Sequence, residues 1–207
     1  MIAYDPLVTF LLASLFLAIT PGPDNLYVLM QSVVYGYKTG VFITLGLCTG
    51  LIMHTAAVAL GLTLLLQSSL YVLPLLKLFG AGYLVYLSWQ SYRAAAIEIS
   101  LQNHEALTTF QSYQRGIILN VSNPKVGLFF LAFLPQFTNI DQGSLVEQTL
   151  LLGGVFIAIT VIVFTGVALI ASSLSDFLIG APGVQKVMHR VTGSVLLGLA
   201  LHLVLSI

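Results

Sequence analysis

The chain has 207 residues, of which 58% are hydrophobic and 7% are charged, and its formal net charge at pH 7 is zero. Soluble domains carry roughly 25% charged residues, so this composition excludes an ordinary soluble protein and indicates a chain surrounded by lipid. The neutral balance gives no basic surface, so we expect no nucleic-acid partner. A single cysteine, Cys48, excludes an intrachain disulfide and a zinc site built from several cysteines.

Six apolar segments follow along the chain, at residues 7–34, 41–66, 70–89, 117–137, 150–174 and 187–207. Each is long enough to cross a bilayer core, which takes about 20 helical residues. The sequence therefore predicts an all-α integral membrane protein with six transmembrane helices. A polar linker at 93–114 divides this single membrane domain, 1–207, into half-repeats at 1–92 and 115–207.

The first and fourth segments are interrupted near their middles by TPGPDN at residues 20–25 and by SNPK at residues 122–125. The helix-breaking residues are Pro21, Gly22, Pro23 and Pro124. In hydrocarbon, free backbone groups survive only where they are buried in protein or line a cavity. Broken helices in corresponding halves therefore predict a transporter binding site, with an ordinary proline kink as the alternative.

A half of three crossings must be followed by a half of opposite orientation, so the sequence predicts two inverted three-helix repeats. All the loop Lys and Arg residues follow the first, third and fifth segments, which makes these loops cytoplasmic. They are Lys38, Arg93, Arg115, Lys186 and Arg190. Both termini are then outside, although a first segment that only dips into the membrane would move the amino terminus inside.

Two opposite charges lie at the breaks, Asp24 and Lys125. A lone charge facing lipid costs about 2.5 to 3.5 kcal/mol, so we expect both side chains to face the protein interior and to pair. Asp24 can bind a substrate ammonium group or a proton, and Lys125 can bind a carboxylate. The alternative is a purely structural ion pair.

Two asparagines complete the predicted substrate site. Asn123 is a favourable N-cap, with Pro124 as the first helical residue after it. Asn25 is expected either to cap the helix after the first break or to bind substrate directly.

His54 lies near the middle of the second segment. Because the pKa of an unperturbed histidine is close to physiological pH, His54 can relay protons together with Asp24; a neutral, hydrogen-bonded histidine is the alternative. Gly46 and Gly50 allow a close helix contact, which we expect within the protomer rather than in a homodimer.

Several ordered motifs resemble the LysE/RhtB family of bacterial amino acid exporters. They are PGPDN at 21–25, GYKTG at 36–40, the spacing Gly46-x-x-x-Gly50-x-x-x-His54, GAGYL at 80–84, NPK at 123–125 and FLPQF at 133–137. The resemblance implies export of homoserine, threonine, lysine, arginine, leucine or cysteine across the bacterial inner membrane, driven by the proton-motive force.

Exchange of amino acid for protons is our leading hypothesis, because no nucleotide-binding motif is present and Asp24 is the only carboxylate placed within the membrane. No cofactor and no metal are expected. A membrane-embedded enzyme using Asp24 and His54 is the second hypothesis, and a channel or metal-ion transporter is the third.

Overall fold

The computed structural model describes residues 4–19, 22–68, 71–93, 107–173 and 182–205, and every regular element within them is helical. The long helices are α1 (Tyr4–Ile19), α2 (Pro23–Tyr35), α3 (Tyr37–Ser68), α4 (Val72–Arg93), α5 (Thr109–Val121), α7 (Leu145–Ser173) and α9 (Pro182–Leu205). The short elements are α6 (Pro124–Leu128), the π-helix η1 (Phe129–Phe133), and the 3₁₀ turns η2 (Leu134–Phe137) and η3 (Ile140–Gln142). The predicted all-α class is confirmed for these residues.

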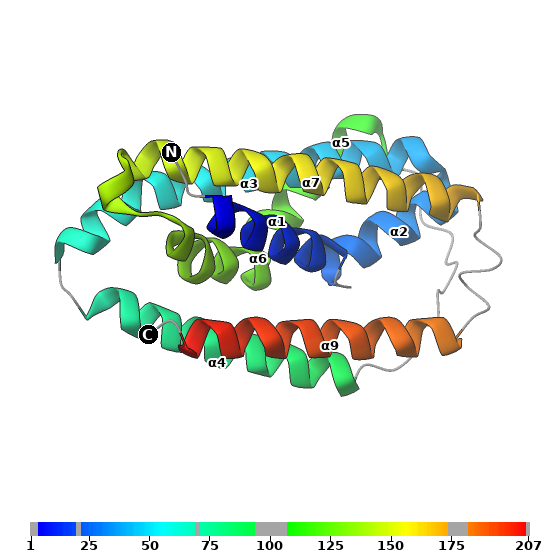
Figure 1. Ribbon diagram of the computed structural model, residues 1–207. Helices are drawn as coiled ribbons and strands as arrows, with labels where there is room; N and C mark the ends of the chain where they lie inside the picture. Colours follow the sequence, from blue (N-terminus) through cyan, green and yellow to red (C-terminus); the bar gives the residue numbers. More distant parts are fainter. Residues whose placement is uncertain (1–3, 20–21, 69–70, 94–106, 174–181, 206–207) are drawn as a thin grey trace.

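The helices lie nearly parallel or antiparallel along one long axis (Figure 1). Helix α3 packs against α5 and α7, α1 and α2 pack against α7, and α4 packs against α9. In Figure 1, α1 and α2 together run from left to right, whereas α5 and α6 run from right to left. The two broken segments thus have opposite directions, which is the arrangement that an inverted repeat requires.

Both predicted breaks are present. Helix α1 ends at Ile19 and α2 begins at Pro23, with a bend of 52°. Helix α5 ends at Val121, and the segment Pro124–Phe137 continues at 50° to it. In each case a proline occupies the first helical position, where its missing N–H costs nothing. Pro21 lies outside the described residues.

Among the described residues, two helices are long and apolar enough to cross a membrane, Tyr37–Gly61 within α3 and Leu145–Ala171 within α7. The number rises to four when each bent pair is counted as one span, and each pair is either a broken span or a re-entrant loop. Helices α4 and α9 are not among these spans, and within α9 the shorter stretch Gly193–Leu205 is apolar. Crossings by α4 and α9 therefore stay a prediction.

Helices α3 and α5 begin earlier than the apolar segments that predicted them. Helix α5 begins at Thr109 because Thr108 and Gln111 form a reciprocal capping box. Helix α3 begins at Tyr37, directly after Gly36, whose φ of 84° allows the chain to turn sharply from α2. The first turns of these helices are polar, so a prediction based on apolar residues alone does not include them.

The closest helix contact joins α3 and α5. A Cβ atom added to Gly46 would overlap the Tyr113 carbonyl oxygen, and one added to Gly116 would overlap the Ile43 carbonyl oxygen. A Cβ atom on Gly50 would lie 2.7 Å from the Asn120 side chain. The glycine spacing predicted from the sequence therefore serves packing within the protomer, as expected.

An aromatic cluster surrounds η1. Phe129 stacks on Phe133 with ring centroids 5.0 Å apart, and it lies 5.0 Å from Phe156 of α7. Phe10 of α1 meets Phe137 edge-on at 5.2 Å. These contacts fix the segment after the second break between α1 and α7. The sequence did not predict the π-helix, which precedes Pro135, a residue without an N–H for a regular helical hydrogen bond.

Candidate functional site

The lengths of α2 and α5 predict that the two breaks lie at membrane depth. Helix α2 has 13 residues, which at about 1.5 Å per residue spans about 18 to 20 Å, a little over half of a roughly 30 Å hydrocarbon core. Helix α5 also has 13 residues. We therefore expect the polar groups at the start of α2 and at the end of α5 to lie near the middle of the membrane.

Asp24 and Asn120 form the contact that joins the two breaks. Asp24 is in the first turn of α2 and Asn120 is in the last turn of α5, and both are buried. Asn120 Nδ2 donates a hydrogen bond of 3.4 Å to Asp24 Oδ2.

Asn123 shapes the second break as the sequence predicted. Its Oδ1 accepts a hydrogen bond of 3.0 Å from the backbone N–H of Lys125, so it is the N-cap of α6, and Pro124 is the first residue of that helix. This cap starts a new helix directly beside Asp24 and fixes Lys125 in its first turn. Lys125 is buried.

Asn25 does not cap α2, so that alternative is wrong. The N-cap is Gly22, which has no side chain, and Asn25 lies inside the helix. Its Nδ2 instead donates a hydrogen bond of 2.7 Å to the carbonyl oxygen of Ala18. Asn25 thus satisfies one of the free carbonyls at the end of α1 and ties the two halves of the broken span together.

A small cavity of about 20 Å³ lies where the two breaks meet, with room for about one water molecule. Its polar lining consists of Asp24, Asn25, Asn120, Lys125 and Thr160, and its apolar lining includes Leu17, Leu47, Leu51, Val126, Phe156 and Phe164. The structure therefore brings Asp24, Asn25 and Lys125 to one place. The ion pair between Asp24 and Lys125 stays a prediction.

Several polar atoms at this cavity are buried without a hydrogen bond to any described group. They are Asp24 Oδ1 and Asn120 Oδ1, and also Asn123 Nδ2, which lies beside the Asp24 carboxyl and is placed to donate to it. Leaving a buried polar atom unsatisfied costs about 1 to 3 kcal/mol, so the two oxygens mark a place for a hydrogen-bond donor. These two acceptor oxygens and the Lys125 ammonium group are complementary to the ammonium and carboxylate groups of a small zwitterion.

His54 lies next to the same site on α3. Its Nε2 is 3.3 Å from the Asn120 carbonyl oxygen, and its ring is 5.8 Å from the Phe130 ring. His54 is half-buried, and both His54 and Asp24 contact Asn120, His54 at the backbone carbonyl oxygen and Asp24 at the side-chain amide. This position is compatible with both alternatives from the sequence, a proton relay and a neutral histidine that packs in the bundle.

Two residues that line the cavity were not predicted from the sequence. Asn120 lies within an apolar run and was not singled out. Its spacing of three residues from Asn123, which is typical of residues on one helix face, could have indicated it. Thr160 comes from α7, and its hydroxyl donates a hydrogen bond of 2.9 Å to the Phe156 carbonyl oxygen, which is an ordinary pattern for a membrane helix. Nothing in the sequence distinguishes Thr160 from other threonines.

No group of three His, Cys, Asp or Glu side chains in the described parts of the chain is placed to hold a metal ion.

Comparison with known proteins shows the family of the chain. The profile of the LysE type translocators matches residues 15–207. The chain belongs to the LysE type translocator family. It is 35% identical, over 89% of both chains, to a homoserine/homoserine lactone efflux protein of Salmonella typhimurium. No solved structure matches the chain significantly.

Other family members are similar over different lengths. An uncharacterized membrane protein of Bacillus subtilis, YrhP, is 28% identical over 100% of this chain and 99% of its own length. A leucine efflux protein of Salmonella choleraesuis is 29% identical over 64% of this chain and 63% of its own. The predicted family is confirmed, and the chain is a membrane protein of a translocator family.

Proposed function

We propose that this protein is a secondary transporter that exports amino acids across the bacterial inner membrane in exchange for protons. The observation that carries the proposal is the set of unsatisfied buried atoms at the junction of two broken helices. Asp24 and the Asn120 oxygen would hold the substrate ammonium group, and Lys125 and the Asn123 amide would hold its carboxylate.

The substrate class follows from the site and from the relatives. The α-amino and α-carboxyl groups account for the polar lining, so the side chain would meet the apolar walls from α1, α3 and α7. Homoserine is the first substrate to test, because a relative 35% identical is named as a homoserine/homoserine lactone efflux protein. Leucine is the second, by the same argument from the leucine efflux protein.

The cavity at the two breaks is too small for an amino acid, so transport requires it to widen. Six crossings in two inverted repeats, at 1–92 and 115–207, would allow it to open to either side in turn. Asp24 would then bind the proton while the cavity faces outward and release it inward, with His54 as the relay. An enzyme or a metal-ion transporter remains the alternative, but neither explains the unsatisfied atoms.

Purified protein in sealed liposomes tests this exchange. When the interior is made acidic, protons that flow out of the liposomes should drive labelled homoserine inward against its concentration gradient, without sodium. A protonophore should collapse the accumulation. Asp24→Asn should lose it, whereas Asp141→Asn, which neutralises an exposed acid in η3, should not. Accumulation that requires sodium and ignores the pH gradient would refute proton exchange.

We also propose that the end of the bundle containing Lys38 and Arg93 faces the cytoplasm, with both termini outside. In a protein with the buried Cys48 replaced by alanine, a cysteine at exposed Thr109 should resist an impermeant thiol reagent in intact cells. A cysteine at exposed Glu147 should react. Strong labelling at residue 109 would reverse this orientation.

A further inference from the structure

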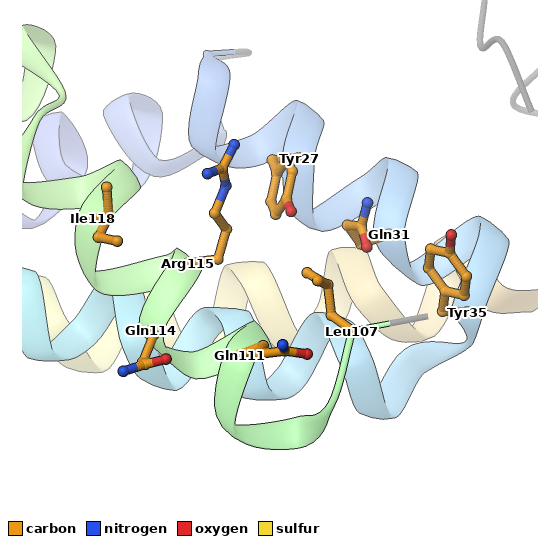
Figure 2. Close-up of a pocket in the computed structure, with 8 residues that line it drawn as sticks. All are labelled: Tyr27, Gln31, Tyr35, Leu107, Gln111, Gln114, Arg115 and Ile118. Atoms are coloured by element: carbon orange, nitrogen blue, oxygen red, sulfur yellow. The ribbon is translucent and has the colours of Figure 1, made fainter. Parts of the chain in front are cut away.

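A second, open pocket of about 620 Å³ lies between α2 and α5 (Figure 2). Its lining combines three residues of α2, four of α5 and the residue before the α5 cap. They are Tyr27, Gln31, Tyr35, Leu107, Gln111, Gln114, Arg115 and Ile118. This volume is within the range of small-molecule sites, which is about 300 to 1,000 Å³.

The pocket is on the path to the central site. Tyr27, Gln31 and Tyr35 recur every four residues and so share one face of α2, the helix that begins beside Asp24. Arg115 precedes Asn120 by five residues, about 7.5 Å along α5. Both helices thus run from this pocket to the small central cavity, and in the proposed orientation the pocket opens toward the cytoplasm.

The charged group of the pocket is Arg115. Figure 2 shows its side chain extending from α5 toward α2, with the guanidinium carbon 5.8 Å from the centroid of the Tyr27 ring. Arg115 is exposed, and it has no hydrogen bond or ion pair with any residue that the structure describes. A guanidinium has five N–H donors arranged to bind a carboxylate through two parallel hydrogen bonds.

A complementary group lies one turn along α2. Gln31 Oε1 is buried and accepts no hydrogen bond from the described part of the chain. It can accept one from an ammonium group, and the face of Tyr27 can contribute a cation–π contact. Tyr27 and Gln31 are separated by about 6 Å along the helix, so a small amino acid can reach Arg115 and Gln31 together.

We propose that Arg115 and Gln31 form an entry site that binds the carboxylate and ammonium groups of a cytoplasmic amino acid before the central cavity opens. The proposal rests on the proposed export function. It gives Arg115 a role in capturing substrate, separate from the central site of Asp24 and Lys125. A carboxylate released by Arg115 then moves along α5 toward Lys125.

Transport into inside-out membrane vesicles, whose cytoplasmic face is outward, gives the first test. Arg115→Gln should raise the KM for labelled homoserine about three- to tenfold and leave the maximal rate unchanged. Arg115→Lys should raise it less. Arg93→Gln is the matched control, since Arg93 is an exposed arginine at the same end that stacks on Trp89, 4.4 Å away, and lies outside the pocket. It should leave KM unchanged.

Chemical protection gives a second test that does not need transport. Phenylglyoxal should modify Arg115 and Arg93 in the vesicles, as read by mass spectrometry. Homoserine should protect Arg115 alone, its carboxamide should not, and protection should persist in Asp24→Asn. An unchanged KM with no protection of Arg115 would overturn the entry site even where transport occurs. Protection without any transport would support the site and refute the export function.

Discussion

Asp24→Asn and Lys125→Met are each expected to abolish export while the amount of protein in the membrane stays near that of the parent. Removing one member of a buried, hydrogen-bonded charge pair costs about 2 to 5 kcal/mol, which corresponds to a loss of at least about thirtyfold. Asp24 and Lys125 line the cavity where both broken helices meet, so substrate should contact both. Cells preloaded with an amino acid by dipeptide feeding allow export to be measured in the medium.

Two comparisons separate a binding role from a structural one. Lys38→Met removes an exposed positive charge at the start of α3, away from the cavity, and should export normally. The double variant Asp24→Asn, Lys125→Met should remain inactive, because restoring neutrality does not restore the groups that hold substrate. Export by the double variant at the parental rate would show that the two charges form only a structural pair.

Gly116→Leu is expected to destabilise the protein more than any substitution on the lipid-facing surface. A Cβ atom at Gly116 would overlap the Ile43 carbonyl oxygen and lie 3.0 Å from the Gly46 Cα atom. These are backbone atoms of another helix, so α3 and α5 must separate. Overpacking of this kind costs about 1 to 3 kcal/mol or more, which lowers the melting temperature of the detergent-solubilised protein by several degrees.

Gly154→Leu is the matched control, because Gly154 is an exposed glycine within α7 whose Cβ position has no atom within 4 Å. It gains helix propensity without a clash, so it should melt at the parental temperature or slightly above. Equal melting temperatures for the two leucine variants would show that the contact between α3 and α5 is not as close as described.

The parts of the fold that depend on local chemistry could be predicted from the sequence. Pro23 and Pro124 stop helices through their own covalent structure, and Asn123 caps through its own side chain, so both breaks are where the sequence placed them. Asn25 was harder, since whether it caps α2 or binds the end of α1 depends on how the chain turns between them.

The rest of the site depends on tertiary packing. Arg115 entered the sequence analysis only as a loop charge, yet α5 begins at Thr109 and carries Arg115 into a pocket against α2. Gln31 is recognised as a pocket residue only in the structure, where it shares a face of α2 with Tyr27 and Tyr35 and α5 lies opposite (Figure 2). The place of Asn120 in the site likewise depends on Asp24, which is far from it in the sequence but hydrogen-bonded to it in the bundle.

The central claim is that this chain moves amino acids out of the cell, and its most direct test is the medium of dipeptide-fed cells. Cells with and without the protein are loaded in parallel with dipeptides of homoserine, threonine, lysine, arginine, leucine and cysteine. We expect at least one of these amino acids to accumulate outside only when the protein is present, and a protonophore to stop its release. Equal release of every amino acid from the two kinds of cell would contradict the account.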